Sequence, residues 1–351
     1  GYMDWTEYAP FGVSAQIIPW NYPVEMTARS LSAALARGNA CVIKSPEMTP
    51  LTNAWLAKAA EAAGFPPGAV NVICGLGRDA GAALAGHRDV NQIVFTGSVP
   101  TGIAIATAAA QNVVPCVLEL GGKSAAIVHA DADLDAFEND IRWGIYFNAG
   151  QVCSAMSRVI VHESRHDELV ERAEKVAKSL SVGPGIERTE FGANMGSMVS
   201  EGQRDRAHGM IARAEEQGAR IAAGGRKPNR PGAFLEPTVL SGVTPDMDIA
   251  QQEVFGPVLS VLSFRKDAQA IEIANGTDYG LVAGVFTADL DRATLAARQL
   301  RAGQIFVNEW YADGVETPFG GFGKSGYGRE KGREALWNYV QTKNIAIRLK
   351  G

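Results

Sequence analysis

Over its first 120 residues the chain alternates short apolar runs with alanine-rich stretches, and this rhythm constrains the fold more than any other feature. In chain order, we expect strands at 13–19, 40–44, 70–74 and 92–95 and helices at 25–36, 51–63 and 101–110. Such alternation predicts a mainly parallel sheet with helices on both faces, the doubly wound α/β layout of dinucleotide-binding domains. Thr49 is expected to cap the second helix, with Pro50 at its first position.

The texture of the chain changes after Gly121–Gly122, where charged helices at 133–147 and 166–180 replace the alanine-rich ones. The expected division is a cofactor-binding domain over 1–120, an α/β catalytic domain over 121–325 and a C-terminal segment over 326–351 that returns to the first domain. That segment ends in an apolar–polar alternation over 339–349, which is typical of a strand. This strand can pair with a second subunit and serve oligomerisation, or it can join a sheet of its own chain.

Composition excludes several classes of function. A net charge of −5 argues against nucleic acid as a partner, because phosphate binding needs concentrated Lys and Arg. No apolar run reaches the roughly 20 residues needed to span a bilayer, so no membrane partner is expected. The start of the chain lacks the pattern of a signal peptide. The cysteines are too widely spaced for a zinc site or a disulfide framework, which favours a reducing, cytoplasmic compartment and predicts no metal. They are Cys41, Cys74, Cys116 and Cys153.

Two segments have the chemistry of a nucleotide site. A turn from Gly97 to Gly102 joins an expected strand to a helix, and its glycines and helix-start amides favour a phosphate. Its spacing is GxxxxG and no P-loop lysine follows, which disfavours ATP. At the end of another strand, Lys44 can reach ribose or phosphate oxygens, and Glu47 can accept from ribose hydroxyls and repel a 2′-phosphate. The alternatives are an ordinary strand–helix turn and a solvated charged loop.

Three further residues can do acyl chemistry. Cys153 lies among small and amide residues that suit an exposed thiol, although a free cysteine is also a common core residue. Glu119 ends an apolar run before two glycines, where burial would raise its pKa and make it a general base; a surface glutamate is the alternative. Asn21 lies in a loop between Pro19 and Pro23, and its amide is either an oxyanion donor or a turn residue.

Together with segments 252–257 and 318–330, these motifs in this order resemble the aldehyde dehydrogenase superfamily. The resemblance implies that Cys153 is the nucleophile, Glu119 the general base and Asn21 the oxyanion-stabilising amide. The presence of Glu119 points to the non-acylating branch. Glu330 resembles a glutamate near the path by which protons leave the general base. The resemblance also implies a set of cofactor-binding residues, which comprises Ile18, Trp20, Lys44, Glu47, Gly97, Ser98, Gly102, Leu120, Glu253 and Phe255.

The function implied by the resemblance is the oxidation of an aldehyde to a carboxylic acid, with hydride transfer to NAD through a thiohemiacetal and a thioester on Cys153. Glu47 favours NAD, and NADP stays possible. A homodimer or homotetramer is expected. None of the histidines lies in a motif, which disfavours a Cys–His hydrolase. Chains of this family carry a further N-terminal segment, so an inactive scaffold or partner subunit, or a cysteine esterase, remains an alternative.

Substrate choice is expected to depend on aromatic residues. By resemblance, the segment 308–311, which contains Trp310 and Tyr311, faces the substrate entrance, and Tyr22 and Phe147 add aromatic walls. An apolar or aromatic aldehyde fits such walls, and a quaternary ammonium aldehyde fits them through cation–π attraction. The alternative is that these rings only pack.

Overall fold

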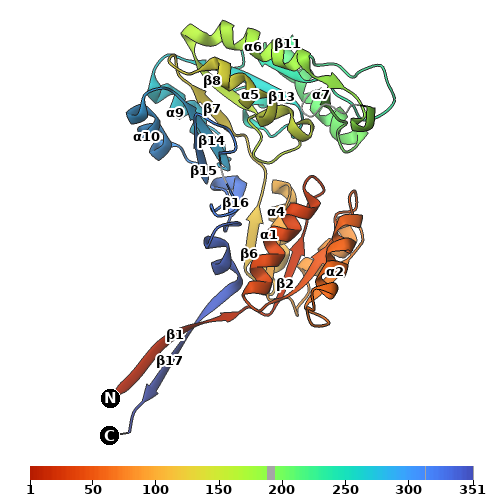
Figure 1. Ribbon diagram of the computed structural model, residues 1–351, viewed down its shortest axis with the longest axis vertical. Coiled ribbons are helices and arrows are strands. Elements are labelled where there is room, and N and C mark those ends of the chain that lie inside the picture. The colour runs from red at the N-terminus through yellow and green to blue at the C-terminus, as the bar shows by residue number, and fades with distance from the viewer. Residues whose placement is uncertain (188–193, 313, 351) are drawn as a thin grey trace. The chain divides into compact units, whose positions relative to one another are not determined.

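The computed structural model describes residues 1–187, 194–312 and 314–350. The chain forms two compact units (Figure 1). The first unit comprises Gly1–Leu120, Gly314–Gly320 and Gly326–Gly351, and the second comprises Gly121–Asp313 and Gly321–Ser325. Each unit is built around its own sheet with helices packed against it, so the expected α/β fold is confirmed.

The first unit contains a six-stranded sheet in the order β16-β6-β5-β2-β3-β4, parallel except for β16. Its strands are β2 (Val13–Ile17), β3 (Ala40–Lys44), β4 (Val70–Ile73), β5 (Gln92–Thr96), β6 (Cys116–Glu119) and β16 (Gly326–Tyr327). Its helices are α1 (Pro23–Ala36), α2 (Leu51–Ala62), α3 (Ala82–Ala85) and α4 (Val99–Ala110). The strands and helices expected in this region are therefore confirmed, with ends shifted by at most two residues.

Alternate residues of β5 enter two different cores. Phe95 packs with Ile105 of α4, whereas Val94 packs with Ala34 of α1. Because successive side chains of a strand point to opposite faces, helices must cover both sides of this sheet. Because these strands are buried on both faces, their sequences are short, continuous apolar runs and do not alternate with polar residues.

The expected N-cap at Thr49 is wrong. Helix α2 is preceded by Pro50 in the N-cap position, and no side chain caps it. The Thr49 hydroxyl instead donates to the Trp20 carbonyl oxygen at 3.2 Å. The hydroxyl thus links the segment after β3 to the segment after β2, and it does not cap the helix.

The two ends of the chain pair with each other. Strand β1 (Tyr2–Pro10) runs antiparallel to β17 (Val340–Arg348), with Tyr2 opposite Arg348 and Pro10 opposite Val340 (Figure 1). The expected C-terminal strand is confirmed, and its partner within the chain is β1, which the sequence pattern did not reveal. Most residues of both strands are exposed. The role of β17 in oligomerisation stays a prediction.

The second unit contains a seven-stranded sheet in the order β11-β12-β13-β8-β7-β14-β15, parallel except for β11. Its strands are β7 (Ala125–Val128), β8 (Arg158–His162), β11 (Arg220–Ala223), β12 (Thr238–Ser241), β13 (Val258–Phe264), β14 (Val282–Phe286) and β15 (Gln304–Val307). A separate parallel pair joins β9 (Ser181–Val182) to β10 (Asn194–Met195). The helices are α5 (Leu134–Tyr146), α6 (His166–Ser179), α7 (Glu201–Glu216), α8 (Asp248–Gln251), α9 (Asp267–Asn275) and α10 (Leu290–Gln299).

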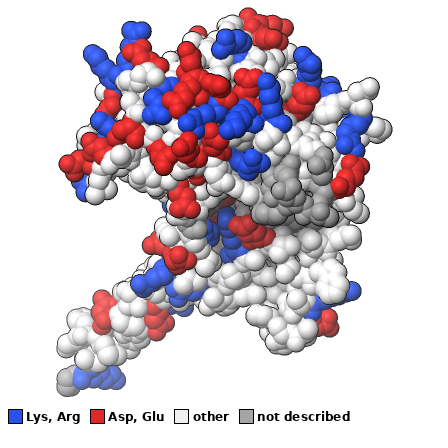
Figure 2. Space-filling view, turned by 45° about the horizontal axis from the view of Figure 1, so that its top comes forward, with Lys and Arg blue, Asp and Glu red and all other residues white. Residues whose placement is uncertain are grey.

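The surface of the second unit carries interspersed charges of both signs (Figure 2). On α6, Arg172 pairs with Glu168 of the same helix and with Asp135 and Glu138 of α5. The charged helices that distinguished this part of the sequence are therefore solvated faces joined by ion pairs. Among the described residues, no helix is long and apolar enough to cross a membrane.

Candidate active site

The glycine turn of the first unit lies between β5 and α4. A Cβ on Gly97 would lie 2.5 Å from the Phe95 ring, and one on Gly102 would lie 2.6 Å from a Leu120 methyl carbon. Both positions therefore require the absence of a side chain. Ser98 is the N-cap of α4, yet its Oγ bonds the Thr101 Oγ1 at 2.9 Å and caps no backbone amide. The amides that start α4 thus keep the geometry that favours an anion.

Lys44 and Glu47 form a pair at the end of β3. The Lys44 Nζ donates to Glu47 Oε2 at 2.6 Å, and the Gly77 amide donates to Glu47 Oε1 at 3.3 Å. Partial burial opposes ionisation of Glu47, but the Lys44 and backbone hydrogen bonds outweigh it and lower the pKa of Glu47. Glu47 is therefore an ionised acceptor held in place, as a residue that binds a ribose would need to be.

Asn21 lies in the short segment that joins β2 to α1. The segment is anchored before it by the Ile18 amide, which donates to the Lys44 carbonyl oxygen, and after it by Pro23 at the start of α1. The Trp20 carbonyl oxygen accepts the Thr49 hydroxyl. These constraints hold Asn21 half-buried at the carboxyl end of a central strand.

Glu119 ends β6, between β5 and β16 in the sheet of the first unit. It is 2% exposed, and neither of its carboxyl oxygens has a hydrogen-bond partner among the described residues. Burial first, and the nearby Glu330 second, raise the pKa of Glu119 well above its usual range. The burial and raised pKa expected for Glu119 are found. Its role as a base stays a prediction.

Glu330 is the second buried carboxyl of this region. Both of its oxygens lack hydrogen-bond partners within the described chain, and the Arg29 Nη1 lies 3.9 Å from its Oε2. Burial raises the pKa of Glu330 to about 7, although the Arg29 charge opposes this rise. Two carboxyls thus share a buried site, where the Glu330 charge adds to the effect of burial on the pKa of Glu119 and the charges of Arg329 and Arg29 oppose it.

Cys153 follows a strained turn in the second unit. Asn148 and Ala149 have φ values of 50° and 53°, a left-handed conformation that costs energy at non-glycine residues. Gly150 has a φ of 70°, and a Cβ there would lie 2.2 Å from the Gly256 carbonyl oxygen. Gln151 stabilises the turn: its amide nitrogen donates to the Asn148 carbonyl oxygen, and its amide oxygen accepts from the Val199 amide.

The four cysteines have different surroundings. Burial raises the pKa of Cys41 to about 12 and that of Cys116 to about 11, so both remain thiols at neutral pH. Cys74 is exposed, and Cys153 is half-buried. A Cβ on Gly122 would lie 2.6 Å from the Cys153 carbonyl oxygen, so this glycine permits the backbone of Cys153 to approach. Cys153 is therefore held by backbone packing.

Glu253 meets the same glycine pair. It follows α8, and the Gly122 amide donates to its Oε1 at 3.1 Å. A Cβ on Gly121 would lie 2.1 Å from Glu253 Oε2, so the carboxyl group lies directly on the glycine backbone. Phe255, with a φ of 54°, turns the chain two residues later. The second unit thus brings together Cys153 and Glu253 around Gly121–Gly122.

Trp310 packs in the core of the second unit. It is 4% exposed, its ring meets Phe306 edge to face, and a Cβ on Gly284 would lie only 2.8 Å from it. Its amide donates to Asp140 Oδ1 at 2.8 Å. Trp310 is therefore a packed core residue and not part of an exposed substrate wall. Phe147, in contrast, is 42% exposed.

Two charged residues near these groups, the half-buried Arg29 and the buried Lys123, were not identified from the sequence. No local sequence pattern indicates that Arg29 lies near the site. Lys123 stood inside the quoted Gly-Gly-Lys motif, but only its burial in the fold marks it as unusual.

The fold and site define a class of protein: a doubly wound nucleotide-binding unit joined to a second α/β unit that carries the half-buried Cys153. The model of the Aldehyde dehydrogenase family matches residues 1–345, and the chain belongs to this family.

An aldehyde dehydrogenase of Alternaria alternata is 45% identical over 341 residues, which cover 97% of this chain and 68% of the fungal protein. The "Aldehyde dehydrogenase, cytosolic 1" of Rattus norvegicus is 42% identical over 348 residues, covering 99% of this chain and 69% of that protein. The NAD+ complex structure of aldehyde dehydrogenase from Bacillus cereus has a TM-score of 0.96 and 41% identity, covering 99% of this chain and 70% of the bacterial one.

Proposed function

We propose that this protein oxidises an aldehyde to a carboxylic acid, with NAD as the hydride acceptor and Cys153 as the nucleophile. The observation that carries the proposal is the strained turn at 148–150, which holds the Cys153 backbone against Gly122, next to Glu253. Membership of the aldehyde dehydrogenase family supports the reaction. The Bacillus cereus relative, a complex with NAD+, supports the cofactor.

The residues of the first unit fit a dinucleotide. The uncapped start of α4 after Ser98 suits a diphosphate, and the paired Lys44 and Glu47 suit an adenosine ribose. An ionised Glu47 disfavours a 2′-phosphate, so NAD is favoured over NADP, which stays possible. The other proposed cofactor contacts are Ile18, Trp20, Gly97, Gly102, Leu120, Glu253 and Phe255.

In the proposed first step, the Cys153 thiolate adds to the aldehyde carbon. The oxyanion that forms accepts hydrogen bonds from the Asn21 side-chain amide and the Cys153 backbone amide. Loss of one such donor typically costs roughly 10²–10³-fold in rate. NAD, when bound, accepts the hydride of the tetrahedral carbon, which leaves a thioester on Cys153.

In the proposed second step, Glu119 takes a proton from water, the resulting hydroxide attacks the thioester carbonyl, and the acid leaves as the Cys153 thiolate is released. A base with a raised pKa suits this role, because it accepts the proton readily. It must first lose the proton that it holds at rest. The rate of hydrolysis is therefore expected to rise with pH until Glu119 is ionised.

A cysteine substitution tests the proposal. Cys153→Ala is expected to lower aldehyde-dependent NADH formation by roughly 10⁴-fold or more, since nucleophile removal leaves only binding and electrostatic effects. Cys74→Ala is the matched control, because this exposed cysteine lies in the other unit, and its rate is expected to equal that of wild type. Normal turnover by Cys153→Ala would refute the proposal.

The same proposal includes a cytoplasmic location and a homodimer or homotetramer. The name of the rat relative supports the location. The exposed β1–β17 ribbon supports assembly, because a two-stranded sheet is marginally stable alone in water.

Because Trp310 is buried, Phe147 is the more exposed aromatic candidate for substrate contact, and an apolar or aromatic aldehyde is proposed. Initial rates with benzaldehyde, straight-chain and betaine aldehydes test this choice.

A further inference from the structure

Lys123 is a buried lysine whose amine makes no hydrogen bond to any described residue. It follows the glycine pair that holds Glu253, and it is 2% exposed. Its Nζ has no hydrogen-bond partner in the described part of the chain. Burying an ammonium group without a partner is costly. If Lys123 only filled space, a methionine of similar volume would serve as well without loss of stability. The buried amine therefore calls for a separate explanation.

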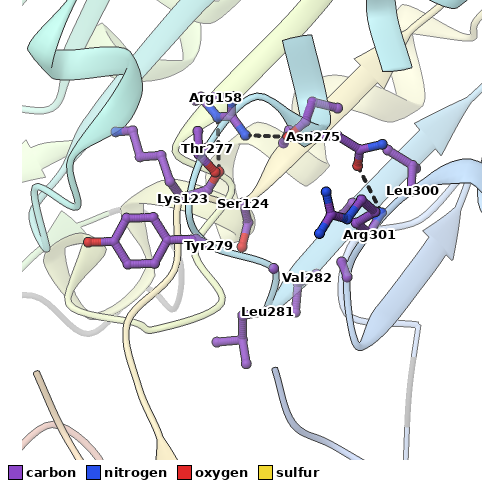
Figure 3. A pocket seen from close by; sticks show the side chains of 15 residues that line it. Lys123, Ser124, Arg158, Asn275, Thr277, Tyr279, Leu281, Val282, Leu300 and Arg301 are labelled. Atoms are coloured by element: carbon purple, nitrogen blue, oxygen red, sulfur yellow. Dashed lines mark hydrogen bonds between the residues drawn. The ribbon is translucent and has the colours of Figure 1, made fainter. Parts of the chain in front are cut away.

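Arg158 fixes the backbone of Lys123 and leaves its amine unpaired. The Arg158 Nε donates to the Lys123 carbonyl oxygen, and its two Nη atoms donate to the carbonyl oxygens of Ile273 and Ala274, all at 2.9 Å. These three bonds direct the Arg158 guanidinium to the backbone. Figure 3 shows Lys123 extending to one side of a small pocket together with Tyr279, while Arg301 lies on the opposite side.

The group that attracts the Lys123 amine is Glu253. Burial is the main effect on both: it lowers the pKa of Lys123 to about 7 and raises that of Glu253 to about 7. Against burial, the Gly122 hydrogen bond lowers the pKa of Glu253 most, followed by the Arg206 charge and then the Lys123 charge. The Glu253 charge in turn raises the pKa of Lys123, whereas Arg158 lowers it. The Glu253 charge also raises the pKa of Tyr279.

We propose that Lys123 is a positioning residue that acts through Glu253, keeping this carboxylate ionised on the Gly121–Gly122 backbone so that it can accept from hydroxyls of the cofactor ribose. This inference rests on the proposed function, because it takes Glu253 as a ribose ligand. The hydrogen bond from the Gly122 amide fixes the orientation of the Glu253 carboxylate. Lys123 adds its charge to that of Arg206, and a carboxylate out of contact with water needs such counter-charges to remain ionised.

A double-mutant cycle tests this arrangement by titration of the full chain with NAD at pH 7, followed by protein fluorescence. Lys123→Met is expected to raise the Kd for NAD about tenfold, and Glu253→Gln by at least as much. Because Lys123 acts through the carboxylate, the double variant is expected to bind no more weakly than Glu253→Gln alone. Arg301→Met is the matched control: it removes an exposed cation from the opposite side of the same pocket, and its Kd is expected to be unchanged.

The pH dependence gives a second readout. Affinity for NAD is expected to rise as pH rises through about 7, the value held by Glu253. Without the Lys123 charge the pKa of Glu253 is higher, so in Lys123→Met this rise moves to higher pH. The difference from wild type shrinks at alkaline pH, where Lys123 itself is neutral. A merely structural role would weaken binding equally at every pH.

Several outcomes would overturn the inference. Additive losses in the cycle, or wild-type affinity in Lys123→Met, would contradict it while leaving the proposed function intact. A wild-type chain that does not bind NAD would overturn the proposed function and this inference with it. If Lys123→Met does not fold, Lys123→Gln takes its place in the same cycle, with the same expected results.

Discussion

Each unit of the molecule buries one pair of ionisable groups, and the two pairs are built in opposite ways. In the first unit, Glu119 and Glu330 are two carboxyls without hydrogen bonds among the described residues, and Arg329 and Arg29 are the cations that act on Glu119. In the second unit, Glu253 has a hydrogen bond from Gly122 and opposite charges in Arg206 and Lys123. A like-charged pair must retain a proton, whereas an opposite-charged pair can remain ionised. The first pair is suited to moving a proton, and the second to holding a fixed carboxylate.

The largest expected effect separates the two pairs by kinetics. Glu119→Gln is expected to lower steady-state turnover roughly 10²–10⁴-fold, because general-base catalysis is lost. NADH formation in the first turnover is expected to persist, since hydride transfer precedes hydrolysis. Rapid-mixing measurement of NADH should therefore show a burst of about one equivalent. Glu253→Gln at saturating NAD is expected to show no such burst, and a burst in that variant instead would reverse the assignment of the pairs.

A smaller effect is expected from Glu330→Gln. The Glu330 charge raises the pKa of Glu119, so its removal should lower that pKa and move the acidic limb of the kcat–pH profile to lower pH. Stability should change as well. The folded-state pKa of Glu330 is about 7, above its ordinary value, so its contribution is full at low pH and is lost as pH rises through about 7. Near pH 8, Glu330→Gln should be more stable by about 3 kcal/mol.

Chemical denaturation at pH 5 and pH 8 measures this difference, and the exposed Glu61→Gln on α2 is the control. If Glu330→Gln is no more stable relative to wild type at pH 8 than at pH 5, the pKa of Glu330 is not raised in the folded protein. An acidic limb that moves to higher pH would contradict the coupling between Glu330 and Glu119.

Much of the fold was predictable from the sequence because it depends on local periodicity. Strand β3, at Ala40–Lys44, was predicted with its observed ends because buried parallel strands are continuous apolar runs bounded by turns. Strand β1 was missed because both of its faces are largely exposed and its partner, β17, lies at the far end of the chain. Its pairing is a long-range property that no local window contains.

The candidate site was predictable to the extent that its residues stand in motifs. Cys153 and Glu119 were singled out because their motifs, taken in order with the others, resemble those of the aldehyde dehydrogenase superfamily; the residues beside them alone left a core cysteine and a surface glutamate as alternatives. Lys123 was missed because its burial depends on Arg158, 35 residues away, and on Glu253, which bonds the preceding glycine across 131 residues. Trp310 was assigned to the substrate wall because composition alone cannot distinguish a packed ring from an exposed one.

Infrared spectroscopy tests the contrast between the two pairs most directly. Burial first, and the Glu330 charge second, hold the pKa of Glu119 well above its usual range, so its carboxyl should keep a proton at pH values where an ordinary glutamate is ionised. The carboxylic-acid C=O absorption that Glu119 contributes there should be present in wild type and in Glu253→Gln, and should be lost in Glu119→Gln. A band that survives in Glu119→Gln and disappears in Glu253→Gln would contradict the account.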